Sequence, residues 1–191
     1  MPFEKGIAAE HIPDDEVLQL LDYPAYFHLL KLPLPENRDG ILKALADDSL
    51  VCPCDAGGWN ITNLGAILFA KGLEDFHSLR RKAIRVIQYR GTSRVETLKE
   101  HVGVKGYASD FEGLIGFING VLPSNEVIEQ ALRKTVPRFP ELAVRELVAN
   151  ALIHQDFFVT GVGPMVEIFE DRIEITNPGA PLVDTQRFVD T

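Results

Sequence analysis

The sequence predicts an α+β protein: a helical, winged-helix-like and mixed α/β N-terminal region, followed by a smaller α/β sandwich of one helix and a β-hairpin. Composition is the first observation. The chain has 191 residues, 46% hydrophobic and 25% charged, which is typical of a globular protein with one large domain or two small ones. The second observation is helical periodicity in the N-terminal part, and the third is strand-like alternation of side chains at 82–91 and over 161–179.

Short helices and one small hairpin are expected in the N-terminal part. Asp14 or Asp15 can cap the first helix, and Pro24 can open the second. A hairpin with its turn at 55–58 follows, and then an apolar helix closed by Gly72. This order resembles a winged helix, and a generic α+β layer explains it equally well. The expected elements are two helices within 12–32, a helix within 37–51, a hairpin within 50–62 and a helix over 63–73.

The middle of the chain combines a strand with helical segments. Side chains over 84–89 alternate between two faces, which predicts a strand with at least one buried face. The segment 93–106 either pairs with this strand or leads to the next helix. An apolar stripe begins near 109, and we expect Pro123 to divide residues 109–134 into two helices.

A proline-bounded segment, 135–141, separates these elements from the C-terminal part and predicts two domains, 1–136 and 137–191. The second domain begins with a helix and continues with a β-hairpin over 161–179. Pro178 and Gly179 stop the second strand of this hairpin. We expect Val166, Ile168, Ile173 and Ile175 on one side, Glu167 and Glu174 on the other, and Glu170-Asp171 at the turn.

Charge and cysteine content narrow the classes of function. The net charge of −9 disfavours a duplex-binding surface, because phosphate contacts come from Lys and Arg. One basic stretch, 78–94, is best explained as basic residues that flank a buried strand. The two cysteines and the scattered histidines suggest no structural metal site. With no secretory signal and no apolar run of roughly 18 to 20 residues, a cytoplasmic location is expected.

The helix that contains "RELVANALIHQDF", residues 145–157, has two distinct sides. At about 100° per residue, Glu146, Asn150 and Ile153 lie opposite a wide apolar arc that should pack on a core. The polar row either meets water or forms one wall of a site. The small neighbours Ala143 and Ala149 leave room for a ligand to approach. The apolar arc consists of Val144, Leu147, Val148, Ala151 and Leu152.

The residue types in this row suit a nucleotide triphosphate site. A carboxylate and a carboxamide at i and i+4 point the same way. The Glu146 carboxylate can orient or deprotonate a water, and the Asn150 carboxamide oxygen is a suitable ligand for Mg²⁺. The turn "NPG" at 177–179 follows the hairpin and can border the same cleft.

These residues also resemble a known family. The segments "ELAVRELVANALIHQDF" and "GPMVEIFEDRIEITNPGAPLVD" closely resemble the ATPase-like segment of bacterial and archaeal RecG-related transcriptional regulators. Those proteins join a Schlafen AlbA-like DNA-binding domain to a divergent GHKL (Bergerat-fold) ATP-binding module. "WNITNLGAILFAKGLEDF", "RKAIRVIQYRG" and "LPSNEVIEQALRK" resemble their connecting region, so the likeness spans nearly the whole chain. The resemblance implies that the C-terminal part is a partial GHKL-like α/β sandwich.

Roles for individual residues follow from this resemblance, together with ATP and Mg²⁺ as cofactors. Glu146 matches the N-box glutamate that positions or activates the attacking water. Asn150 matches the N-box asparagine that ligates Mg²⁺. Asn177 and Gly179 stand where the first adenine-contacting motif, Asp-x-Gly-x-Gly, normally lies.

The sequence also departs from the family pattern. Asn177 replaces the aspartate that accepts from the adenine amine, and Pro181 stands where the second glycine is expected. The glycine-rich lid and the upstream DNA-binding domain are missing, so we expect a middle fragment that does not hydrolyse ATP. DNA is then a partner of the missing domain rather than of this acidic segment, and self-association into a homo-oligomer is compatible with it.

Two other functions remain open at this stage. A structural or dimerisation module that has lost nucleotide binding is the alternative that the degraded glycine motif and the acidic balance favour. DNA binding through the winged-helix-like part and the basic patch between Arg80 and Arg94 is disfavoured by the net charge.

Overall fold

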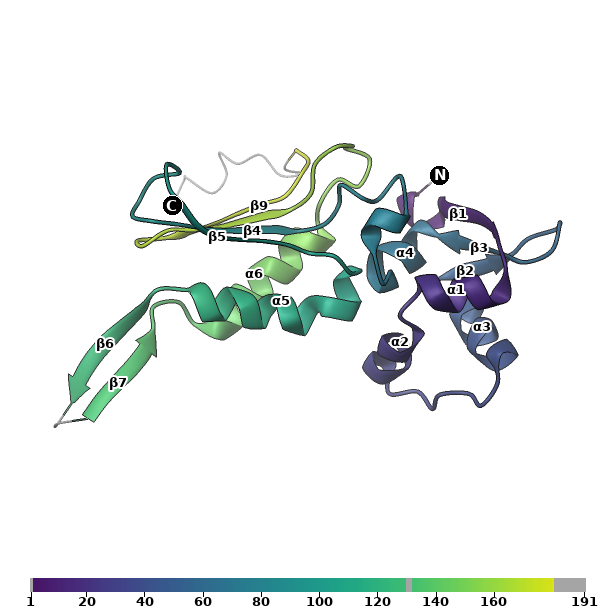
Figure 1. Cartoon of the computed structure of the whole chain (residues 1–191), viewed down its shortest axis with the longest axis horizontal. Coiled ribbons are helices and arrows are strands. Elements are labelled where there is room, and N and C mark those ends of the chain that lie inside the picture. Colours follow the sequence, from purple (N-terminus) through teal and green to yellow (C-terminus); the bar gives the residue numbers. More distant parts are fainter. Residues whose placement is uncertain (1, 130–131, 181–191) are drawn as a thin grey trace, which may run out of the picture.

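The computed structural model describes residues 2–129 and 132–180 and confirms the α+β class. Within these residues there are six α-helices, a three-stranded sheet, a four-stranded sheet and a separate two-stranded hairpin. The molecule is elongated (Figure 1). The N-terminal part lies at one end, the four-stranded sheet with α5 and α6 forms the centre, and the β6–β7 hairpin projects from the other end.

The N-terminal part packs four helices around a small antiparallel sheet with the strand order β1-β3-β2. The predicted helices and the β2–β3 hairpin are confirmed, whereas strand β1 was not expected. The predicted end of the last helix is wrong, because α4 ends at Phe69 with Ala70 as its cap rather than at Gly72. The elements are β1 (Ile7–Ile12), α1 (Asp14–Leu20), α2 (Tyr23–Leu30), α3 (Arg38–Asp47), β2 (Val51–Pro53), β3 (Trp59–Thr62) and α4 (Asn63–Phe69).

Side-chain caps explain where three of these helices begin. Asp22 accepts from the amide of Ala25 at the start of α2, where Pro24 occupies the first turn as predicted. Asn37 and Thr62 cap α3 and α4 in the same way. The expected cap of α1 is wrong: α1 already begins at Asp14, and Pro13 occupies the cap position without a side-chain hydrogen bond.

The central part is a four-stranded sheet with the order β5-β4-β8-β9. Its two middle strands, β4 and β8, run parallel, and the outer pairs are antiparallel. Segment 93–106 therefore pairs with β4, one of its two expected roles. The elements are β4 (Arg85–Tyr89), β5 (Thr97–Val102), α5 (Tyr107–Val121), α6 (Glu141–Ile153), β8 (Met165–Ile168) and β9 (Ile173–Thr176).

The segment after Pro123 forms a hairpin, so the second helix expected within 109–134 is wrong. Strand β6 (Ser124–Glu129) pairs antiparallel with β7 (Leu132–Pro137). Leu122, the residue before the proline, already has extended backbone angles, which end α5. Proline restricts the preceding residue to this conformation, and the chain continues as a strand rather than as a new helix.

Two large hydrophobic cores and a small cluster of Ile87, Tyr89 and Phe169 stabilise the described residues. The first joins α1 to α4 and the small sheet, from Val17 to Leu79. The second lies between α5, α6 and one face of the four-stranded sheet, and its members include Ile118 from α5, Val148 from α6 and Val166 from β8. The second core thus combines side chains from both sides of position 136, where the sequence predicts a domain boundary.

The helices of the described residues are too short or too polar to cross a membrane.

Candidate functional site

Helix α6 presents the predicted polar row to solvent. Glu146 and Asn150 are both exposed, one helical turn apart. Within residues 2–129 and 132–180, neither side chain takes part in a hydrogen bond or an ion pair. On the opposite side, Val144, Val148 and Leu152 are buried in the second core. The site helix is therefore anchored by one face and leaves the other available for contacts.

The apolar side of α6 is narrower than predicted. Leu147 was expected in the buried arc, but it is 52% exposed. Ile153 is 66% exposed. The helix packs against α5 and β9 along a single stripe, which does not reach Leu147. Two apolar side chains therefore flank Asn150 at the surface.

The turn after β9 is fastened to the C-terminal end of α6. The side-chain amide of Asn177 donates to the carbonyl of His154 at 3.0 Å. The amide of Asp156 donates to the carbonyl of Pro178 at 2.7 Å. His154 itself donates through its backbone to the carbonyl of Asn150, one turn earlier. The structure thus brings Asn177 to the helix that presents Glu146 and Asn150.

The contact between the turn after β9 and the residues after α6 requires a glycine at position 179. Its φ of +124° lies in the region that L side chains rarely adopt. A Cβ atom built on it would lie 2.9 Å from the Cβ of Asp156. A side chain at this position would push the turn away from α6. The position expected for the second glycine, Pro181, lies outside the described residues.

A buried lysine, which was not predicted from the sequence, stabilises the loop after α6 by hydrogen bonds. The ammonium of Lys82 donates to the carbonyls of Val159 (2.6 Å) and Asp156 (3.4 Å). Burial lowers the pKa of Lys82. Nothing in the sequence of the basic stretch 78–94 distinguishes Lys82 from its exposed neighbours, so its burial could not be predicted.

A second set of buried polar groups supports this arrangement. The Tyr107 hydroxyl donates to the Lys82 carbonyl (2.5 Å) and accepts from the Gln155 side chain (2.9 Å). Burial raises the pKa of Tyr107 to about 12. The segment before β4, the start of α5 and the residues after α6 are therefore joined by hydrogen bonds.

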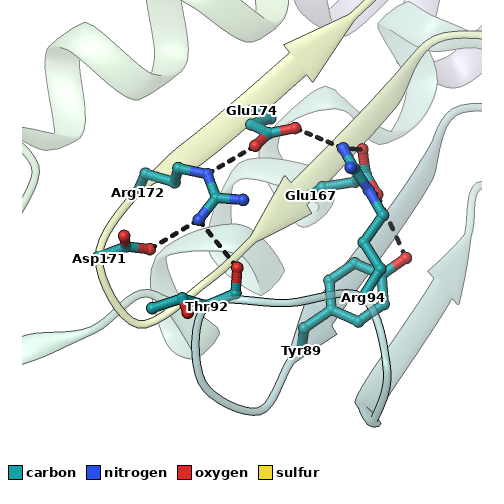
Figure 2. A network of polar contacts seen from close by, with 7 residues as sticks. All are labelled: Tyr89, Thr92, Arg94, Glu167, Asp171, Arg172 and Glu174. Atoms are coloured by element: carbon teal, nitrogen blue, oxygen red, sulfur yellow. Dashed lines mark hydrogen bonds and ion pairs between the residues drawn. The ribbon is translucent and has the colours of Figure 1, made fainter.

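The sheet face opposite α5 and α6 carries a polar network (Figure 2). Glu167 on β8 is 3% exposed and accepts from Arg94 and from the Tyr89 hydroxyl. The hydrogen bonds from Arg94 lower the pKa of Glu167, against the opposing effect of burial. Glu174 accepts from both Arg94 and Arg172. Glu167 and Glu174 pair across β8 and β9 on the side predicted from the alternation, opposite the side that packs on α5 and α6.

An apolar cavity of about 470 Å³ lies beside the polar row. It is bordered by α6 through Ala149, Leu152 and Ile153, and by Phe111 of α5. The N-terminal part contributes Leu29, Leu64 and Leu68 to its wall. Arg145 at its rim is paired with both carboxylate oxygens of Glu112. Ile153 borders both this cavity and the row of Glu146 and Asn150.

Comparisons with known proteins show a fold but no family. No protein-family model and no curated protein matches the sequence. Among solved structures, the chain is similar to the DIP2311 protein from Corynebacterium diphtheriae, with a TM-score of 0.59 and 21% sequence identity. The match covers 93% of this chain and 34% of the other, so this chain spans about a third of the length of that structure. Nearly all of the chain therefore shares its fold with part of a larger protein.

Proposed function

We propose that the chain is the middle part of a DNA-associated transcriptional regulator and that α6, with the turn after β9, is a divergent GHKL-like nucleotide site. One observation carries this proposal: the hydrogen bonds of Asn177 and Pro178 to the end of α6. They join the turn that resembles the adenine-contacting motif to the helix that resembles the N-box. These two segments are the halves of the predicted site.

The side chains of the row fit the phosphate end of a magnesium nucleotide. Asn150 offers a carboxamide oxygen and Glu146 a carboxylate, and Mg²⁺ prefers oxygen ligands of this kind. Both are exposed and have no partner among the described residues, so no existing interaction has to break. When bound, the ion would neutralise phosphate charge. Glu146 would hold a water at its carboxylate.

Asn177 supports recognition of an adenine despite replacing an aspartate. Its amide nitrogen is committed to the His154 carbonyl, which orients the amide group. The remaining side-chain oxygen is an acceptor, as required by an exocyclic amine. The exposed apolar surface of Ile153, next to His154, provides a contact for a flat ring.

Positive charge is scarce along this row. Arg145, the basic residue of α6, is engaged by Glu112. Phosphoryl transfer depends on groups that stabilise the charge developing on the phosphates. We therefore expect nucleotide binding without hydrolysis.

Isothermal titration with Mg-ADP and Mg-ATP tests this function. Magnesium-dependent binding should weaken about tenfold in Asn150→Ala, the loss expected for one charge-assisted contact. Glu141→Gln, which removes an exposed carboxylate from the first turn of the same helix, is the matched control and should bind like the parent. Glu146→Gln should also bind, and no phosphate should be released by any of the proteins. Absence of binding, or equal binding by Asn150→Ala, contradicts the proposal.

A dimerisation module is the second candidate, because α6 exposes Leu142, Leu147 and Ile153. A second copy of the chain that covers these side chains would remove them from water. Sedimentation equilibrium distinguishes this function from nucleotide binding. A dimer that Leu147→Glu dissociates, combined with silent nucleotide titrations, supports the second candidate and excludes the first.

A further inference from the structure

The two ends of the basic stretch 78–94 differ in their ion pairs. At the far end, Arg90 is paired with Glu96, and Arg94 with Glu167 and Glu174. At the near end, Arg80 and Arg81 are exposed and form no ion pair within the described part of the chain. The uncompensated positive charge of this stretch therefore lies before β4.

Arg80 and Arg81 line a cavity of about 510 Å³, which we call the arginine pocket. Arg85 forms another part of its wall and is also paired with Glu100 at 2.6 Å. The lining also includes the glycine-containing loop 161–164 and the turn 176–178. Helix α6 contributes nothing to this lining, so the pocket is separate from the row of Glu146 and Asn150.

The backbone that presents the two arginines is firmly held. Leu79 and Lys82, the residues on either side of them, are almost completely buried. The amide of Arg80 donates to the Phe76 carbonyl at 3.0 Å. Because this backbone is already ordered, less entropy is lost there when a ligand binds.

The loop on the other side is fitted to this backbone. A Cβ atom on Gly163 would lie 2.7 Å from the carbonyl oxygen of Ala83 and 2.9 Å from that of Arg81. Only glycine permits such a close approach. The amides of Gly161 and Val162 donate no hydrogen bond within residues 2–129 and 132–180. Both residues line the arginine pocket.

The chemistry of the pocket selects an anion with several charges. Guanidinium groups bind phosphate oxygens through paired hydrogen bonds, and backbone N–H groups add further donors. Three arginines and no carboxylate are among the described residues that line the pocket, in a chain whose overall charge is −9; of the three, Arg85 is paired with Glu100. The cavity has the size of a small-molecule site rather than the extended basic stripe that nucleic acids require.

We propose that the arginine pocket binds a di- or triphosphate group of a small molecule. This site does not depend on the nucleotide site proposed for α6, because the two share only the turn that contains Asn177.

Titration calorimetry with sodium tripolyphosphate, without magnesium and at constant ionic strength, tests this inference. The parent chain should bind, and Arg81→Gln should lose roughly tenfold in affinity, as expected for one charge-assisted contact. Arg80→Gln/Arg81→Gln should lose more. Arg90→Gln removes the same charge from an exposed arginine of the same stretch and should stay within about twofold of the parent.

Three results overturn the proposal. One is absence of binding by the parent chain, and another is an equal loss in Arg81→Gln and Arg90→Gln. The third is salt-sensitive binding of duplex DNA with no response to tripolyphosphate, which would make the arginines a nucleic-acid contact. Circular dichroism of each variant ensures that lost binding does not come from lost folding. Asn150→Ala should leave tripolyphosphate binding unchanged, so this site and the nucleotide site can fail separately.

Discussion

Glu167, in the interior of the four-stranded sheet, accepts hydrogen bonds from Arg94 on both of its carboxylate oxygens, at 2.6 and 2.9 Å (Figure 2). The Tyr89 hydroxyl adds a third hydrogen bond at 3.2 Å. A buried carboxylate is costly unless it is paired and hydrogen-bonded. The loop between β4 and β5, which carries Arg94, is thus fastened to β8.

Replacing the carboxylate should destabilise the sheet. Glu167→Gln keeps the shape of the side chain but removes the charged acceptor of Arg94, and the free energy of unfolding should fall by roughly 1–3 kcal/mol. Urea unfolding followed by circular dichroism measures the change. Glu96→Gln, which removes an exposed carboxylate partner of Arg90, is the control and should have little effect. An equal loss in both variants contradicts the assigned role of Glu167.

The Glu167 carboxylate should make the free energy of unfolding depend on pH. The hydrogen bonds from Arg94 lower the pKa of Glu167 in the folded state. The unfolded chain then binds a proton more readily, so the stabilisation is complete above the ordinary glutamate pKa and is lost as the pH falls below it. Unfolding free energies measured from pH 7 downwards should fall less steeply in Glu167→Gln. Parallel curves for the two proteins would exclude this linkage.

Two glycines should respond in opposite ways to alanine. Gly163→Ala brings a Cβ atom within 2.7 Å of a backbone oxygen, and overpacking of this kind costs about 1–3 kcal/mol. Gly116 lies within α5 and has open space around it, so Gly116→Ala should stabilise the helix by about 0.5–1 kcal/mol. Thermal unfolding of the two variants should shift in opposite directions. A stabilised Gly163→Ala protein contradicts the tight contact with the 81–83 backbone.

Removing the buried ammonium should loosen the loop after α6. Lys82→Met fills a similar volume but leaves the carbonyls of Asp156 and Val159 without their donor. Hydrogen–deuterium exchange should accelerate in residues 156–161 and stay unchanged in the N-terminal core. Lys71→Met, at an exposed lysine that also donates to a backbone carbonyl, is the control. Exchange that is equally slow in both variants would show that Lys82 does not hold the loop.

Local patterns in the sequence predicted much of the fold. Alternating side chains gave the register of the last hairpin, in which Val166 faces Ile175 and Ile168 faces Ile173. Apolar periodicity gave the first three helices, and Pro24 marked the start of the second. Strand β1 was missed because it is defined by pairing with β3, about 50 residues away. The β6–β7 hairpin was missed because its apolar residues also fit a helical period.

The candidate site was accessible from sequence only in part. The spacing of Glu146 and Asn150 predicted a shared, exposed face, and the structure places both there. The hydrogen bond from Asn177 to His154 joins residues 23 positions apart and follows from tertiary packing. Burial of Lys82 and the space beside Arg80 and Arg81 also depend on long-range contacts, which no local pattern encodes.

Amide chemical shifts recorded during a titration with Mg-ADP test the nucleotide site most directly. At 21.2 kDa the chain is accessible to ¹H–¹⁵N spectroscopy. Beside the changes that phosphate binding produces at the arginine pocket, we predict shift changes on the exposed side of α6 from Glu146 to His154 and at the turn 176–179. The changes on α6 should require about tenfold more Mg-ADP in Asn150→Ala. Changes confined to 80–85 and 161–164, or no changes at all, would contradict a nucleotide site on α6.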